Sequence, residues 1–174
     1  MPKIVRRLAV ALTVLTNLPS VTVATGPAPV PASSMWTNVT PAGVDLVNEL
    51  PCGNFGSITM VADPARPSNL FTQFHCQGVW KSVDYGLTWV GPINTGRGGA
   101  GASGAGGLAI ARGPDGQPPT LYSAGIRGTG LGFWKSTDGG VSWTNYRVTP
   151  GGDRQDFYPP VVNPYDPDHL LMNA

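Results

Sequence analysis

Asp84 and Asp138 are the residues whose type and spacing first suggest chemistry in this chain. They lie 54 residues apart in two near-identical segments, Gly78–Trp89 and Gly132–Trp143. Two carboxylates on opposite sides of a bond are what general acid–base catalysis of glycoside hydrolysis requires. Each aspartate, however, stands inside the same pattern, Ser-x-Asp-x-Gly-x-Thr/Ser-Trp. The surroundings of the two carboxylates therefore decide between a catalytic and a structural role.

The pattern around each aspartate predicts a tight turn. An aspartate side chain accepts hydrogen bonds from backbone N–H groups a few residues further on, and serine does so more weakly. Glycine takes the positive φ that other residues resist, and tryptophan packs its ring against the hairpin. We therefore predict a structural role for both sets of residues: Ser82, Asp84, Gly86, Thr88 and Trp89, and Ser136, Asp138, Gly140, Ser142 and Trp143.

The elements that must position these turns repeat as well. Leu70, Leu121 and Leu170 mark the same place in three successive units. A period near fifty residues is typical of propeller blades, and 24 Gly with 18 Pro favour short strands over long helices. We predict an all-β chain of about two and a half four-stranded blades. Its strands are expected at 56–62, 69–74, 78–83 and 88–92, then at 107–112, 119–124, 132–137 and 142–148, and finally at 160–163 and 169–173.

An incomplete set of blades has a physical consequence. A propeller closes with about 4 to 8 blades, and each blade buries its faces only against its neighbours. Two and a half blades leave apolar faces and strand edges uncovered. We therefore expect a fragment of a larger propeller of about 6–8 blades. An open stack completed by self-association is the alternative.

The duplicated pattern resembles the Asp-box, or BNR repeat, of the sialidase-like, sortilin-like and xyloglucanase-like propellers. Two full matches at blade spacing carry the resemblance, which covers roughly residues 54–174. In such propellers the box holds the blade together, so the resemblance implies that a ligand binds elsewhere.

Strand parity locates the expected ligand face. With four antiparallel strands in a blade, the duplicated turns lie at one end and the loops between strands two and three, and between blades, lie at the other. Long loops on a rigid scaffold are where binding residues concentrate. We predict that a glycan or a protein ligand is bound there, and the alternative for each individual side chain, which its residue type favours, is an ordinary solvated loop position. The candidates are His75, Gln77, Arg97, Arg127, Asp153, Arg154, Asp156 and Tyr158.

The resemblance to hydrolases does not extend to their catalytic residues. Sialidases place an arginine ahead of the early blades, and this chain has no arginine between Arg7 and Arg66. The position that matches the catalytic aspartate of the xyloglucanase-like family holds His75. No catalytic residue is therefore assigned, and the expected function is that of an exported binding propeller. The alternative is a divergent glycoside hydrolase with its carboxylates in missing blades.

The N-terminus predicts export. Lys3, Arg6 and Arg7 precede the mostly apolar run Leu8–Thr16, which is too short to span a membrane. We expect a signal peptide at 1–24, a Pro/Ala/Ser-rich linker and lead-in at 25–53, and the propeller at 54–174, in a secreted or periplasmic protein. Loss of the leader's three basic residues leaves 8 basic against 10 acidic residues, so nucleic acid is not an expected partner.

The remaining motifs predict neither a metal nor a cofactor. Cys52 and Cys76 have no CxxC or ligand partner. In an oxidising compartment they form one disulfide, and the alternative is two buried thiols. Gly99–Gly104 matches the dinucleotide pattern GxGxxG but precedes a strand, so we expect a loop. Asp166–His169 is expected to be a proline-containing turn and not a metal site.

Overall fold

The computed structural model describes residues 36–48, 55–94, 106–125, 132–146, 158–163 and 166–172. Within these residues the chain is all-β, and every strand belongs to the unit Thr37–Ala174. No helix in the described part is long and apolar enough to cross a membrane. The predicted signal peptide lies outside the described residues, as do most of the linker and the GxGxxG segment.

The first sheet contains three antiparallel strands in the order β1 (Ser57–Asp63), β2 (Arg66–Phe74) and β3 (Gly78–Ser82). The prediction of a full fourth strand at 88–92 is wrong. Val90 exchanges two backbone hydrogen bonds with Lys81, of 2.9 and 2.8 Å, and this bridge stands alone. Pro92 follows closely and has no N–H to donate, so the pairing cannot continue regularly.

The second sheet contains the predicted four strands in the order β4 (Leu108–Ala111), β5 (Thr120–Gly125), β6 (Gly132–Ser136) and β7 (Thr144–Tyr146). Its register repeats that of the first sheet. Phe71 lies opposite Lys81, and Tyr122 lies opposite Lys135. In both pairs the lysine ammonium sits over the aromatic ring, at 5.5 and 5.6 Å from the centroid. The repeat in the sequence is therefore also a repeat in strand pairing.

The third sheet pairs β8 (Val161–Asn163) with β9 (Asp166–Leu171). The prediction that Asp166–His169 forms a turn is wrong, because β9 already begins at Asp166, which lies opposite Asn163. Proline is tolerated in a strand where its missing N–H is not needed for the ladder, as in an edge strand. Among the described strands β9 pairs only with β8. The Pro167 carbonyl instead accepts a hydrogen bond from the Tyr122 hydroxyl at 2.6 Å.

Side chains alternate between the two faces of each sheet, and we name these faces by what they pack against. The forward face turns toward the next sheet along the chain, and the back face turns toward the previous one. The forward face of the first sheet carries Val61, Phe71 and Val79. It packs against the back face of the second sheet, which carries Leu108, Ile110, Leu121 and Trp134.

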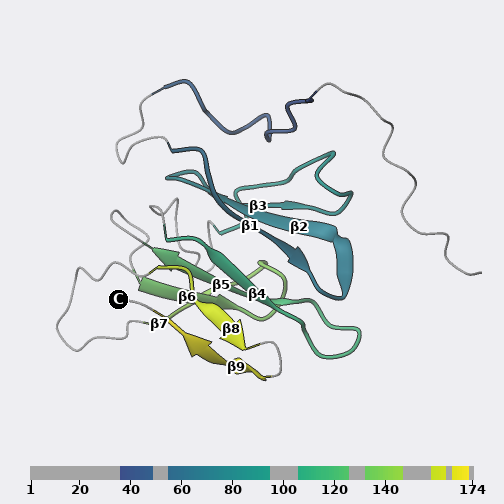
Figure 1. The fold of residues 1–174 in the computed structure, drawn as a ribbon, viewed down its shortest axis with the longest axis vertical. Coiled ribbons are helices and arrows are strands. Elements are labelled where there is room, and N and C mark those ends of the chain that lie inside the picture. Colours follow the sequence, from purple (N-terminus) through teal and green to yellow (C-terminus); the bar gives the residue numbers. More distant parts are fainter. Residues whose placement is uncertain are drawn as a thin grey trace, which may run out of the picture. The chain divides into compact units, whose positions relative to one another are not determined.

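The second and third sheets pack in the same way. Ala109, Ala111, Tyr122 and Phe133 on the forward face of the second sheet meet Val162, Leu170 and Met172. The first strands of the sheets follow one another, since β1 contacts β4 and β4 contacts β8 (Figure 1). Successive antiparallel sheets with adjacent first strands are the arrangement of propeller blades. The chain is all-β and fits an incomplete β-propeller.

Candidate functional site

The Asp84 carboxylate lies in the turn after β3, where both of its oxygens accept hydrogen bonds. Oδ1 accepts from the Thr88 N–H at 2.9 Å and from the Ser82 hydroxyl at 2.7 Å, and Oδ2 accepts from the Thr88 hydroxyl at 2.5 Å. The Thr88 hydroxyl and N–H, followed by the Ser82 hydroxyl, lower the pKa of Asp84 to about 2. At neutral pH this group is an ionised acceptor without a proton to give.

The Asp138 carboxylate repeats this geometry in the turn after β6. It accepts from the Ser142 N–H at 2.9 Å, the Ser142 hydroxyl at 2.5 Å and the Ser136 hydroxyl at 2.7 Å. The Val141 N–H donates to it as well, at 3.0 Å. Partial burial raises the pKa of Asp138, but the Ser142 and Ser136 hydrogen bonds outweigh it and the pKa is lowered. Both aspartates are thus engaged in holding their turns.

The two turns also share a glycine requirement, with one difference. Gly86 and Gly140 have φ of 86° and 93°, and their N–H groups donate to the serine hydroxyls of their turns. The position after each aspartate is also left-handed, but Tyr85, with φ of 60°, stands where the second turn has Gly139, with φ of 69°. A non-glycine residue in this region is uncommon and is strained by its Cβ.

His75 and Gln77 lie at the other end of the first sheet, in the turn between β2 and β3. His75 is buried, and its ring meets the exposed Phe55 edge-to-face with centroids 4.7 Å apart. The Nδ1 atom of His75 lies 3.3 Å from the Sγ atom of Cys76. The structure therefore makes His75 a support for an exposed ring. Sequence reasoning missed Phe55, although an aromatic residue two positions before the first strand of a blade was a signal for it.

Gln77 connects the lead-in segment to the first sheet. Its Nε2 donates to the Asp45 carbonyl and its Oε1 accepts from the Asp45 N–H, both at 2.7 Å. The side-chain amide therefore pairs with the backbone as a neighbouring strand would. Gln77 thus holds the lead-in backbone at Asp45 against the turn.

Tyr158 is exposed and precedes β8 at the loop end, where the first strands of the three sheets, β1, β4 and β8, begin. These strands converge at Gly107, whose φ is +84°. A Cβ at Gly107 would lie 2.5 Å from Cγ of Pro159 and 2.6 Å from Oγ1 of Thr59. Residues just before or within β1, β4 and β8 are therefore in close contact at this loop end, and Phe55 and Tyr158 flank two of those strands.

The other predicted ligand-face residues lie outside the described part of the chain and stay predictions: Arg97, Arg127, Asp153, Arg154 and Asp156. Cys52 lies outside it as well. Cys76 is disulfide-bonded, and the chain contains two cysteines. The backbone of Cys76 has a φ of 61°. The pairing of Cys52 with Cys76 remains the prediction made from the sequence.

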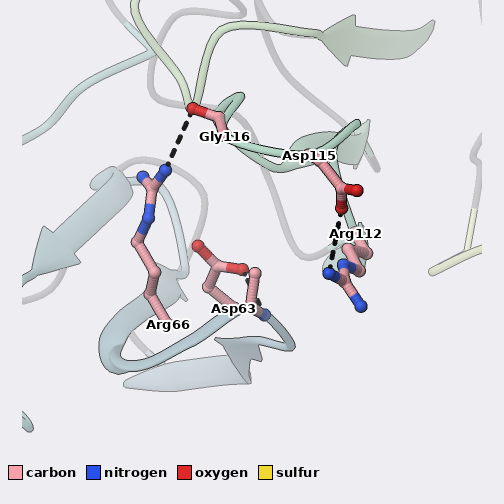
Figure 2. A network of polar contacts seen from close by, with 6 residues as sticks. Asp63, Arg66, Arg112, Asp115 and Gly116 are labelled. Atoms are coloured by element: carbon pink, nitrogen blue, oxygen red, sulfur yellow. Dashed lines mark hydrogen bonds and ion pairs between the residues drawn. The ribbon is translucent and has the colours of Figure 1, made fainter. Parts of the chain in front are cut away.

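A polar network that sequence reasoning missed lies at the opposite, turn end (Figure 2). Arg66 donates to the Gly116 carbonyl at 3.3 Å and so joins the first sheet to the second. Arg112 pairs with Asp115 at 3.1 Å, but both are well exposed and solvent screens the pair. The buried Asp63 accepts from the Ala65 N–H at 2.9 Å, and its Oδ2 has no partner among the described residues.

A hollow of about 460 Å³ lies beside this network. It is lined by Pro64, Ile110, Ala111, Arg112, Gly113, Pro114, Val162, Asn163 and Pro167. Asp63 directly precedes the lining residue Pro64 in the sequence, but it does not itself line the hollow. Within the described residues no three His, Cys, Asp or Glu side chains gather as a metal site would require. The hollow therefore offers few groups for chemistry.

No protein-family model and no curated protein matches the chain. Among solved structures, it is similar to YCF48 from Cyanidioschyzon merolae, with a TM-score of 0.46 and 15% identity over 71% of this chain and 32% of that one. It is also similar to a GH74 enzyme from Niastella koreensis, with a TM-score of 0.41 and 21% identity over 62% of this chain and 16% of that one. The chain thus spans less than a third of the length of either protein. Likeness at this level does not assign an activity.

Proposed function

We propose that the chain is an exported binding module built on Asp-box propeller blades, and that it holds a glycan at the loop end. The observation that carries this proposal is the pair of exposed aromatic rings at that end, Phe55 before β1 and Tyr158 before β8. The rigid sheets would supply a fixed platform, and the loops would supply specificity.

A glycan suits such a surface on chemical grounds. A flat aromatic ring stacks on the C–H face of a sugar, while a few polar side chains orient its hydroxyls. The five polar loop residues outside the described part are expected at the same end by strand parity: Arg97, Arg127, Asp153, Arg154 and Asp156. His75 would position the ring of Phe55, and Gln77 would keep the lead-in segment in place.

The two repeated aspartates would not make this module a hydrolase. Glycoside hydrolysis needs a general acid whose pKa is raised. The pKa values of Asp84 and Asp138 are lowered, and their oxygens are engaged by hydroxyls and N–H groups of their own turns. A module that binds without cleaving is consistent with that chemistry.

Export belongs to the same proposal. The basic and apolar order of residues 3–16 is that of a signal peptide, and an oxidising compartment suits the disulfide at Cys76. Expression of the full chain in a secreting host, followed by mass spectrometry of the released protein, tests it. We expect cleavage near Ala24, and an uncleaved protein that stays in the cell would contradict export.

The binding proposal is tested on a glycan array with the full chain and two matched variants. Tyr158→Ala removes a ring that is 52% exposed at the loop end, and Tyr85→Gly removes one that is 64% exposed at the turn end. A stacked ring is worth about 0.5–1.5 kcal/mol, so Tyr158→Ala should weaken glycan binding roughly twofold to tenfold. Tyr85→Gly should leave it unchanged.

Three outcomes would overturn the proposal. One is the absence of binding to any glycan, and another is equal loss in the two variants. The third is the release of shortened sugars from a bound glycan, which would identify a hydrolase. A reducing-end assay on the glycans that bind in the array would detect this release of shortened sugars.

A further inference from the structure

The forward face of the third sheet repeats a pattern that is covered in the other two sheets. By register, Val161 and Leu171 correspond to Val61 and Phe71 in the first sheet and to Ala109 and Tyr122 in the second. Phe71 and Tyr122 are fully buried by the sheet that follows each of them. Val161 and Leu171 are 68% and 78% exposed.

A hollow of about 520 Å³ lies at the third sheet and is lined by residues of both of its strands: Val161, Val162, Asn163, His169, Leu170 and Leu171. Val161 and Leu171 of this lining belong to the forward face, whereas Val162 and Leu170 belong to the back face. The lining is mostly aliphatic, and the Nδ1 atom of its His169 lies 2.7 Å from the Oδ2 atom of Asp166. Contiguous exposed apolar surface of this kind marks an interaction site.

The back face of the first sheet is the matching surface at the other end of the series. Met60, Leu70 and Trp80 there correspond to Leu108, Leu121 and Trp134 in the second sheet, which are packed by the first sheet.

The lead-in segment covers only part of this back face. Gly43 of this segment and Gly91, which follows the isolated bridge at Val90, lie on the indole of Trp80, where a Cβ at either would come within 2.7 Å of the ring, and they leave Trp80 buried. Met60, in contrast, is 56% exposed.

We propose that this chain associates head to tail with a second copy of itself. The forward face of the third sheet in one copy would pack on the back face of the first sheet in the next. Val161 and Leu171 would then meet Met60 and Leu70, as Val61 and Phe71 meet Leu108 and Leu121 within one chain. The contact continues the interface already present twice between consecutive sheets, and it leaves the loop end free for the proposed ligand.

Such a contact uses two different surfaces, and this makes it separable from a symmetric dimer. Heterologous contacts form rings or open chains, whereas an isologous contact uses the same patch on both copies. A charge on either surface removes one half of the contact. Burial of an unpaired carboxylate in it is strongly unfavourable.

The experiment is sedimentation velocity on the full chain with Leu171→Asp and Met60→Asp. Both sites are exposed in one copy, so both variants should fold, and circular dichroism checks that they do. The unaltered chain should sediment above the monomer. Each variant alone should be monomeric at concentrations at least tenfold higher than those at which the unaltered chain associates. An equal mixture of the two should form dimers and no larger species, because one intact contact remains.

Val141→Asp is the matched control, since Val141 is 71% exposed at a turn and belongs to neither face. It should associate as the unaltered chain does. A monomeric unaltered chain overturns the proposal. Self-association of Met60→Asp alone would overturn it too, because that result indicates an isologous contact between two forward faces. A mixture that stays monomeric would have the same consequence.

Discussion

Asp84 and Asp138 each receive the hydroxyl and the N–H of the residue four positions later, together with the hydroxyl of the serine two positions earlier. These six hydrogen bonds give the two carboxylates a structural role, which is to hold their turns. The same motif that suggested a catalytic pair supplies, at its serine and threonine positions, the donors that hydrogen-bond the ionised carboxylates. Each of these hydrogen bonds spans only two or four residues, so contacts at this scale are the ones that a local sequence pattern can specify.

Replacement of Asp138 measures how much the hydrogen-bonded carboxylate contributes to the free energy of unfolding. Asp138→Ala leaves the Ser142 N–H and hydroxyl and the Ser136 hydroxyl without their acceptor. The free energy of unfolding should fall by about 1–3 kcal/mol, the usual effect of removing a hydrogen-bonded partner. Chemical denaturation measures this change. Asp115→Ala, which breaks an exposed pair, should change it by less than about 0.5 kcal/mol, and similar losses in the two variants would contradict the structural role of Asp138.

Asp84 also predicts a dependence of stability on pH. The pKa of Asp84 in the folded chain is about 2, below the ordinary value of 3.8 for an aspartate. A lowered pKa contributes stability that is present above pH 3.8 and is lost as the pH falls through about 2. The stability difference between the unaltered chain and Asp84→Asn should therefore shrink between pH 5 and pH 2. Urea denaturation across this range measures it, and a difference that stays constant would show that Asp84 does not titrate as described.

At the scale of elements, the register of β4, β5 and β6 repeats that of β1, β2 and β3, and the strand boundaries follow the predicted ones closely. Two predictions failed at prolines. A missing N–H interrupts the pairing near Pro92, yet Pro167 stands within β9, where its carbonyl bonds to Tyr122 of the neighbouring sheet. The effect of a proline depends on which side of the strand needs its N–H, and the sequence alone does not give that side.

Substitution of Gly107 tests whether β1, β4 and β8 come together at this residue. Gly107→Ala adds a Cβ at positive φ and brings it within 2.6 Å of Pro159 and Thr59. Gly116→Ala adds one at φ of +77° with no atom within 4 Å, so it isolates the backbone cost. We expect Gly116→Ala to cost about 1 kcal/mol and Gly107→Ala clearly more, measured by thermal unfolding. Equal losses would mean that the three strands do not meet at Gly107.

At the scale of the molecule, each sheet covers the back of the next, so the forward and back faces form one continuous series. The blade period predicted this succession. It did not predict the contacts that depend on distant partners. The pairing of Gln77 with Asp45 spans 32 residues, and the join of Arg66 to Gly116 spans 50. Local patterns carry no information on such pairs.

The candidate site was predicted in part for the same reason. Strand parity placed His75, Gln77 and Tyr158 at one end of the sheets, away from the duplicated turns. It did not reveal that His75 is buried under Phe55 or that the Gln77 amide is used by the lead-in backbone. Polar residue type suggested contact with a ligand, whereas burial and pairing give these two residues a supporting role.

The packing of consecutive sheets as neighbouring blades is tested most directly by nuclear Overhauser effects from the Hα protons of Gly107. Gly107 stands before β4 of the second sheet, Thr59 lies in β1 of the first, and Pro159 precedes β8 of the third. The structure predicts cross-peaks from Gly107 Hα to side-chain protons of both Thr59 and Pro159 in the folded chain. If either cross-peak is absent in a well-resolved spectrum, the three sheets do not stack in the order described.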